Sequence, residues 1–237
     1  MRDLSSRSRI RKTGGAVASV VLIALAVAVV AATSRQPARA AAGTPPGHSD
    51  AFGDSLADWE ALWLAWFIGD VDIPPDDNGN ADVGHVVLMP IPNAAGDGTP
   101  ASVDVTLDAG QAFVLPLWSA YGFSYSDGTP NDPLVPIAVF KTLDLTFTID
   151  GKTVIDHRNL MDYYSQTLFP DGRLPLDFPP ADAIISLQCT GLTHAPLPPG
   201  KHTMTLDAVN TQALPPQYGG GFADYHNTWD VTVERGK

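Results

Sequence analysis

Leu143-Asp144-Leu145-Thr146-Phe147-Thr148-Ile149-Asp150-Gly151 is the stretch that decides the class of fold. Every second side chain up to Ile149 is apolar, which is typical of a strand with one buried face and one solvated face. Asp150-Gly151 then supplies the two-residue turn that β-hairpins favour, and the chain returns through Lys152 to Ile155. We therefore expect a hairpin here.

The same alternation recurs along the chain, between turns rich in proline and glycine such as Pro198-Pro199-Gly200. The other expected strands are Gly84 to Met89, Val103 to Leu107, Ala112 to Trp118, His202 to Val209 and Thr228 to Glu234. Many short strands separated by turn signals are typical of a sandwich. We predict a mainly β fold, an antiparallel β-sandwich resembling a jelly roll, that forms one domain over residues 51–237.

One N-terminal helix is expected to open this domain. Ser55 stands at its N-cap with Asp58 in the capping-box position, and Gly69 stands where a left-handed residue ends a helix. One stripe at helical spacing carries Leu56, Trp59, Trp63, Trp66 and Phe67, whereas Asp58, Glu60 and Ala61 lie elsewhere. We expect this amphipathic, tryptophan-rich helix to bury its aromatic stripe and to seal an open edge or end of the sandwich.

Residues 1–40 have the features of a signal peptide. Basic residues gather before Lys12, no charge occurs from Ala16 to Ala32, and Ala38-Arg39-Ala40 offers a cleavage site. An apolar stretch of this length also allows the alternative of an uncleaved membrane anchor. We expect cleavage, a flexible leader over residues 41–50, and a secreted or extracytoplasmic location.

The expected mature chain is strongly acidic. Removing residues 1–40 leaves 14 − 7 = 7 Lys+Arg and 26 − 1 = 25 Asp+Glu, and the net charge becomes 7 − 25 = −18. Such a charge repels phosphate backbones and anionic lipid, so we expect no nucleic-acid partner and no membrane partner after signal cleavage. The acidity suits cation binding, or it reflects a solvated surface alone.

Motifs for catalysis are scarce. The chain contains no G-x-S-x-G, H-E-x-x-H, phosphate loop or G-x-G-x-x-G. Cys189, the one cysteine, lies in an apolar run, which favours a buried inert thiol over a nucleophile. A hydrolase that uses scattered Asp and His residues stays open as an alternative, because sequence does not show which side chains converge.

Two groups of residues suggest ligands for a metal ion. An acidic loop after the helix carries oxygen ligands of the kind calcium prefers, at Asp76, Asn78, Asn80 and Asp82. It does not follow the EF-hand pattern, so the alternatives are an irregular calcium site and a plain Asx-rich turn. Histidines also occur beside carboxylates, in Asp156-His157 and Asp224-Tyr225-His226, but without metal-ligand spacing. We expect no cofactor, with calcium as a possible exception.

The chain resembles a family of uncharacterised secreted bacterial proteins, in which a helix with tryptophans spaced W-x-x-x-W-x-x-W follows the signal peptide. The similarity is carried by the tryptophan helix from Phe52 to Trp66 and continues in Gly84 to Met89, Leu107 to Leu117, Ile149 to Lys152, Leu197 to Thr203 and Trp229 to Val233. The resemblance implies export and a β-sandwich-like fold. It implies no activity and no catalytic residue.

Aromatic residues in expected loops are the remaining functional signal. Tyr121, Phe123 and Tyr125 follow the strand that ends at Trp118, Tyr163 and Tyr164 follow the hairpin, and Tyr218, Phe222 and Tyr225 flank a glycine run. Such rings form stacking faces for ligands, or they pack over the sandwich ends. The candidate ligand-binding residues are Tyr125, Tyr163, Tyr164, Asp156, His157, Tyr225 and His226.

The hypothesis from sequence is an exported non-catalytic protein that binds a carbohydrate or another component of the cell envelope. It depends on the export signal, the acidic composition and the loop aromatics without catalytic motifs. The alternatives are a secreted hydrolase of polysaccharide or ester bonds and a structural partner of other surface proteins.

Overall fold

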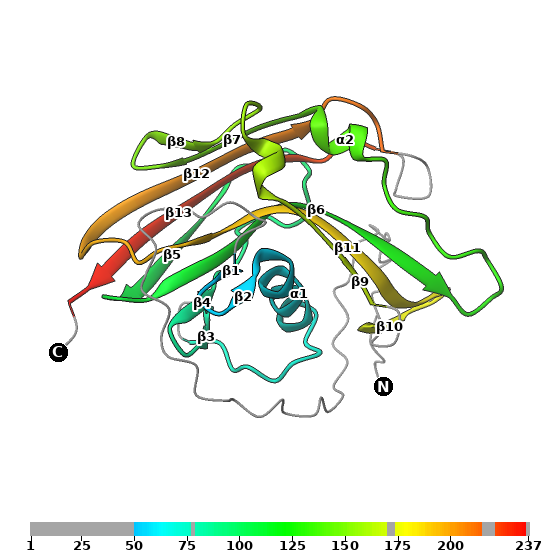
Figure 1. The fold of residues 1–237 in the computed structure, drawn as a ribbon, viewed down its shortest axis with the longest axis horizontal. Coiled ribbons are helices and arrows are strands. Elements are labelled where there is room, and N and C mark those ends of the chain that lie inside the picture. The colour runs from blue at the N-terminus through cyan, green and yellow to red at the C-terminus, as the bar shows by residue number, and fades with distance from the viewer. Residues whose placement is uncertain (1–49, 77–78, 170–173, 215–220, 236–237) are drawn as a thin grey trace, which may run out of the picture.

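Two large β-sheets and one long helix form three layers, and strands β1 and β2 pair in a third, two-stranded sheet (Figure 1). The computed structural model describes residues 50–76, 79–169, 174–214 and 221–235. The predicted signal peptide and all but the last residue of the predicted leader lie outside them. Among the described helices, none has the length and apolar character needed to cross a membrane.

The upper layer in Figure 1 is a five-stranded sheet. Its strands, in spatial order, are β5 (Ala101–Asp108), β13 (Asp224–Glu234), β12 (Gly200–Asn210), β7 (Leu143–Ile149) and β8 (Lys152–Ile155). Strands β7 and β8 form the expected hairpin, in which Ile149 pairs with Lys152. The two turn residues, Asp150 (φ 51°) and Gly151 (φ 71°), both have positive φ. The hairpin prediction is confirmed.

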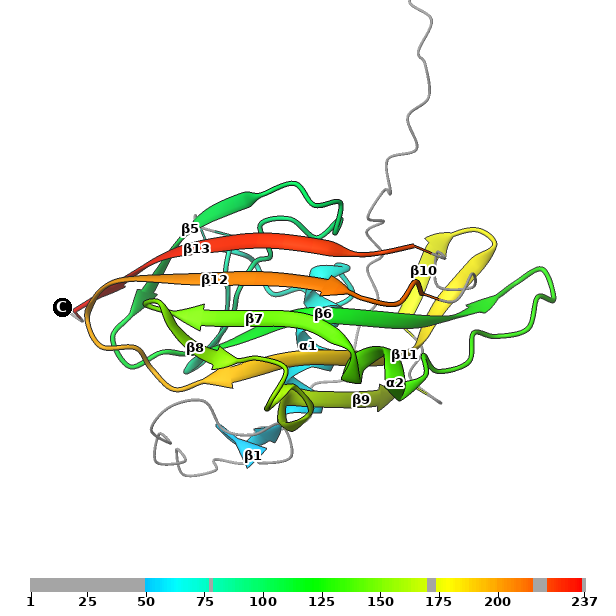
Figure 2. The ribbon, with the colours of Figure 1, turned by 90° about the horizontal axis from the view of Figure 1, so that it is seen from above.

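The middle layer is a six-stranded sheet built around two long, curved strands (Figures 1 and 2). Its path is β10 (Leu174–Phe178), β11 (Ala181–His194), β6 (Ala112–Tyr125), β4 (Val86–Leu88) and β3 (Ala81–Val83), and β9 (Tyr164–Leu168) also pairs with β11. Strand pairs β4–β6 and β5–β13 run parallel, so the pairing is not antiparallel throughout. The mainly β, sandwich-like fold is confirmed.

Helix α1 (Leu56–Phe67) forms the third layer, beneath β6, β9 and β11 (Figure 1). The capping box is present: the Asp58 amide donates to Ser55 Oγ at 3.2 Å, and the Ser55 amide donates to Asp58 Oδ2 at 3.3 Å. Gly69 has φ 80°, as expected at this helix end. Smaller elements are β1 (Asp50–Ala51), β2 (Asp54–Ser55), α2 (Ile137–Lys141) and the 3-10 turn η1 (Leu160–Tyr163).

The buried face of α1 differs from the expected stripe in one important position. Trp59 and Trp63 are buried as predicted, whereas Trp66 and Phe67 are only half-buried. Glu60, placed by the sequence pattern away from the buried stripe, has no exposed surface at all. The expectation for Glu60 was wrong, because α1 packs against three strands and therefore buries a broader arc than one stripe.

The three layers enclose two separate apolar cores. We call the core between the two sheets the sandwich core; Phe113, Phe147 and Trp229 are among its fully buried members. We call the core between the six-stranded sheet and α1 the helix-side core; Trp63 and Leu64 belong to it. The long strand β6 contributes to both cores, because its successive side chains point to opposite faces of the sheet.

A β-bulge in β6 changes which side chains reach which core. Pro116 pairs with Gly191 and Trp118 pairs with Thr190, so Leu117 is an extra residue in β6. Before the bulge, odd-numbered residues such as Phe113 face the sandwich core; beyond it, even-numbered ones such as Ala120 do. The bulge therefore changes the alternation within one strand, and the candidate site lies beside it.

Candidate functional site

An aromatic pocket of about 230 Å³ lies where α1, the bulge of β6 and the start of β13 meet. Five rings line it: Trp63, Phe67, Trp118, Tyr121 and Tyr225. The remaining lining residues are Ile91, Ala94, Ala95, Leu117 and Ser119. We call this cavity the aromatic pocket. It draws on both sheets and on the helix, so only the complete fold assembles it.

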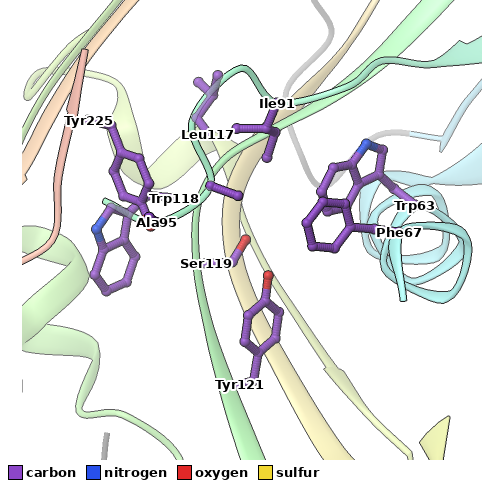
Figure 3. Close-up of a pocket in the computed structure, with 10 residues that line it drawn as sticks. Trp63, Phe67, Ile91, Ala95, Leu117, Trp118, Ser119, Tyr121 and Tyr225 are labelled. Carbon is purple, nitrogen blue, oxygen red and sulfur yellow. The ribbon is translucent and has the colours of Figure 1, made fainter. Parts of the chain in front are cut away.

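The rings lie on opposite sides of the pocket (Figure 3). Trp63 and Phe67 come from one side of α1 and stack on each other, with ring centroids 4.8 Å apart and planes 14° apart. Tyr225 and Trp118 lie across from them, and Tyr121 lies between the two sides, with its hydroxyl toward Ser119. The aromatic rings thus lie on two sides of the pocket, and aliphatic side chains complete its lining.

Polar atoms at the aromatic pocket are few and uncharged. The described residues that line it include no charged side chain. Their polar side-chain groups are the hydroxyls of Ser119, Tyr121 and Tyr225 and the indole N–H groups of Trp63 and Trp118, and the Trp118 N–H is buried without a hydrogen-bond partner among the described residues. Burial raises the pKa of both tyrosines above its ordinary value of 10, so their hydroxyls stay protonated at neutral pH. The indole N–H of Trp63 is engaged elsewhere, because it donates to the Met89 carbonyl at 2.8 Å.

Tyr225 is held in place by close packing of the segment before β5. A Cβ added at Gly96 would lie 2.8 Å from Tyr225 Cζ, so only a residue without a side chain allows the backbone to approach the ring this closely. The Asp224 amide donates to the Gly96 carbonyl, and the Gly98 amide donates to the Asp224 carbonyl, each at 2.9 Å. These bonds fix one wall of the aromatic pocket.

A buried polar chain leads from the aromatic pocket into the helix-side core. Ser119, which lines the pocket, donates from its hydroxyl to Cys189 Sγ at 3.1 Å. Cys189 in turn contacts the Glu60 carboxyl, and the Ser165 hydroxyl donates to Glu60 Oε2. Glu60 Oε1 has no geometric hydrogen-bond partner among the described residues. Burial raises the pKa of Glu60 from 4.5 to about 7 against the smaller opposing effect of Ser165.

Gly191 makes room for this carboxyl group. A Cβ at Gly191 would collide with Glu60 Oε1 and would lie 2.9 Å from the Leu115 carbonyl oxygen. Burial also raises the pKa of Cys189 well above its ordinary value, with a further contribution from Glu60. The thiol is therefore protonated and enclosed, and the prediction of a buried cysteine is confirmed.

Of the tyrosines expected to bind a ligand, Tyr225 lines the aromatic pocket and the other three lie elsewhere. Tyr125 lies within β6 and not in a loop, and its hydroxyl contacts the Asp132 carboxylate at 3.0 and 3.1 Å. Tyr163 is buried in the sandwich core. Tyr164 packs against the same core, and its hydroxyl accepts from Gln188 Nε2 at 2.9 Å. The segment after Trp118 was expected to be a loop, but it is the second half of strand β6, which ends at Tyr125.

The two Asp and His pairs do not share a cleft. Asp156 and His157 follow β8, whereas Asp224 and His226 belong to β13, and β7 and β12 lie between these strands. Asp156 is paired with Arg158, whose hydrogen bonds lower the Asp156 pKa to about 2. His226 contacts Asp207 at 2.7 Å and Asp224 at 3.2 Å, and the Asp207 hydrogen bond raises its pKa.

The acidic loop has the hydrogen bonds of a turn. The Asp76 carboxylate accepts from the Asn80 amide at 2.9 Å and from Asn80 Nδ2 at 3.0 Å, and Asp82 accepts from Gln111 Nε2 at 3.2 Å. Asn78 lies outside the described residues. Within the part of the chain that the structure describes, no three Asp, Glu, His or Cys side chains are placed to hold one metal ion.

Sequence reasoning assigned the tryptophans of α1 to sealing the sandwich and so missed Trp63 and Phe67 as pocket residues. It also missed Trp118 and Tyr121, because the strand was predicted to end at Trp118 and Tyr121 was assigned to a loop, whereas β6 continues to Tyr125. Pro116 was the available signal: proline inside a strand is typical of an edge or a bulge. A bulge was therefore foreseeable at this position, whereas its position beside Tyr225 was not.

Comparison of the chain with family models, with curated proteins and with solved structures finds no match. The resemblance to uncharacterised secreted bacterial proteins therefore stays a prediction. No comparison supports a ligand for this chain, so the case for a ligand-binding site depends on the geometry of the aromatic pocket.

Proposed function

We propose that this chain is an exported, non-catalytic binding protein whose ligand, a carbohydrate or another component of the cell envelope, occupies the aromatic pocket. The observation that carries the proposal is the convergence of five rings from α1, β6 and β13 on one concave site with three hydroxyl groups. Sites for small ligands are mostly apolar and aromatic, with a few polar groups that fix orientation. The aromatic pocket has this composition.

Export is part of the proposal and is supported by the N-terminal sequence. A basic segment, an uncharged apolar stretch and an A-x-A site precede the folded domain in the order typical of signal peptides. The expected mature charge of −18, from 7 Lys+Arg and 25 Asp+Glu, suits a protein that stays in solution outside the cytoplasm.

Hydrolysis is not included in the proposal. The candidate carboxylates and histidines at positions 156, 157, 224 and 226 lie on strands separated by two others, and Glu60 is enclosed. General acid–base catalysis needs a group within hydrogen-bond reach of the substrate. A calcium site is likewise not included, because the Asp76 carboxylate is engaged in the turn that it caps.

The test is a binding measurement with a matched pair of tyrosine variants. The purified protein is incubated with cell-wall polysaccharides, and retention and tryptophan fluorescence are recorded. We expect Tyr225→Ala to reduce binding at least tenfold, because it removes one wall of the pocket. Tyr125→Ala, which removes a ring outside the pocket, should leave binding unchanged.

The other outcomes separate the alternatives. Binding lost with Tyr125→Ala but kept with Tyr225→Ala would place the ligand outside the aromatic pocket and contradict the proposal. Release of soluble sugars or of an ester product would indicate a hydrolase. The absence of both saturable binding and turnover would favour a structural surface protein.

A further inference from the structure

The aromatic pocket has walls that suit a positively charged ligand. Ring faces carry the negative part of the aromatic quadrupole, and a cation placed against them is attracted. Figure 3 shows Trp63 and Phe67 on one side of the cavity and Tyr225 on the other, with the aliphatic side chains of Leu117 and Ile91 between the two sides. A cation bound in this cavity would lie among residues half of which are aromatic.

The polar groups of the pocket are too few for a ligand that needs many hydrogen bonds. The Ser119 hydroxyl already donates to Cys189, and the Tyr121 hydroxyl lies toward Ser119. A sugar ring carries a hydroxyl on most of its carbons, and each one that is buried without a partner lowers affinity. A quaternary, fully methylated ammonium group has no N–H to satisfy, and its methyl surface matches an apolar lining.

The charge of the chain points in the same direction. The described lining residues include no Lys, Arg or His that would repel a cation. The whole chain has 26 Asp+Glu against 14 Lys+Arg, and the expected mature part has 25 against 7. Asp97 and Asp224, which form a backbone bridge, lie on the segments that supply Ala95 and Tyr225. The resulting field concentrates cations and repels anions.

We propose that the aromatic pocket binds an organic cation, specifically a methylated ammonium head group of the kind that choline carries. This inference rests on the proposed function, since it names the chemical class of ligand for the same pocket. It predicts that charge and ring faces, not hydroxyl contacts, determine affinity. The ligand is then an envelope component or small solute that bears such a head group.

The decisive experiment compares choline with its uncharged carbon analogue, 3,3-dimethylbutan-1-ol, on the unaltered protein. Both probes have the same shape and the same hydroxyl, so their difference isolates the charge. Titrations follow tryptophan fluorescence and heat, with sodium chloride replacing choline chloride to hold the ionic strength constant. We expect saturable binding of choline and of tetramethylammonium, and at least tenfold weaker binding of the neutral analogue.

Two variants locate the binding and identify the contact. Phe67→Leu keeps an apolar side chain but removes a half-buried ring, and it should weaken choline binding at least tenfold. Phe222→Leu, a change at a ring that is 62% exposed and does not line the pocket, is the matched control. Tyr225→Phe keeps the ring and removes the hydroxyl, so it should change choline affinity less than twofold.

The outcomes distinguish the proposed cation preference from the proposed binding function. Equal affinity for choline and its neutral analogue would overturn the cation preference. If Phe67→Leu then weakened the binding of both probes, the pocket would still be the binding site. Binding of a sugar that Tyr225→Phe abolishes would also overturn the cation preference and keep the proposed function. If cations, the neutral analogue and sugars all fail to bind, both the cation preference and the proposed binding function are wrong.

Discussion

The sandwich core and the helix-side core differ in the side chains that they bury. The sandwich core lies between two sheets, and its large members, such as Phe147 and Trp229, are fully buried and meet edge to face with centroids 6.3 Å apart. The helix-side core also buries aromatic rings, but it encloses the carboxyl of Glu60 in contact with Ser165 and Cys189. The buried members of the first core are apolar or aromatic, and Trp229 satisfies its indole N–H by donating to the Pro90 carbonyl at 2.7 Å, whereas the second core includes a carboxyl group that burial destabilises when charged.

This contrast bears on the position of the aromatic pocket. Apolar packing between sheets contributes most of the stabilisation of a sandwich, and close packing makes it sensitive to lost volume. The aromatic pocket lies at the border of the two cores, with Trp118 packed against the sandwich core and Trp63 in the helix-side core. The aromatic pocket is thus bordered by the sandwich core on one side and by helix α1 on the other.

The largest expected effect is in the sandwich core. Phe147→Ala removes a ring with no exposed surface and leaves a cavity beside Trp229. We expect the free energy of unfolding to fall by about 3–5 kcal/mol, measured by urea denaturation. Phe222→Ala, at a ring that is 62% exposed, should change it by less than about 0.5 kcal/mol. Equal effects of the two substitutions would contradict the assignment of the sandwich core.

The second prediction concerns the pH dependence of the helix-side core. The folded-state pKa of Glu60, about 7, exceeds its ordinary value of 4.5, so the neutral carboxyl is favoured in the native state. The contribution of Glu60 to stability is therefore complete below pH 4.5 and is lost as the pH rises to about 7. At about 1.36 kcal/mol per pKa unit, this difference of about 2.5 units corresponds to about 3 kcal/mol.

Glu60→Gln should remove this fall in stability between pH 4.5 and 7, measured by urea denaturation at a series of pH values. The chain offers a matched control in Glu234→Gln, because Glu234 is an exposed carboxyl at the end of β13. We expect the control to keep the pH profile of the unaltered protein. Parallel profiles for the unaltered protein and Glu60→Gln would show that Glu60 does not titrate in the enclosed site.

The third prediction tests whether Gly191 serves the buried carboxyl. Gly191→Ala places a methyl group against Glu60 Oε1, and overpacking of this kind costs about 1–3 kcal/mol. Truncating Glu60 to Ala in the same chain should recover part of that loss, because one of the colliding atoms is gone. The Leu115 carbonyl remains in the way, so recovery is incomplete. A double-mutant cycle with a coupling energy near zero would refute the contact.

The strands and the helix were predictable from sequence because their signals are local. Alternation over Leu143 to Ile149, the Asp150-Gly151 turn and the Ser55 cap depend on neighbouring residues, and the structure contains all three. The long strand β11 was not predicted, although apolar and polar residues alternate from Ile185 to Thr190; sequence does not reveal that the polar side chains of this run are buried as well.

The candidate site was not predictable in the same way. The aromatic pocket joins Trp63 to Tyr225, which are far apart in the chain and meet only after both sheets have formed. Tyr121 was assigned to a loop because glycine and serine residues follow Trp118, but β6 continues through them to Tyr125. Glu60 was placed outside the buried stripe because sequence does not reveal that three strands cover α1.

The smallest expected effect tests the docked helix itself. Ser55→Ala removes the side-chain oxygen that accepts from the Asp58 amide, and it should lower the free energy of unfolding by about 1 kcal/mol. Ser55→Asp, which keeps an acceptor and adds negative charge at the helix N-terminus, should retain most of the stability. Because α1 carries Trp63 and Phe67, a loosened helix should also weaken choline binding, whereas Phe147→Ala at a temperature that keeps the protein folded should not. Equal loss of binding in both variants would show that the aromatic pocket depends on global stability and not on the seating of α1.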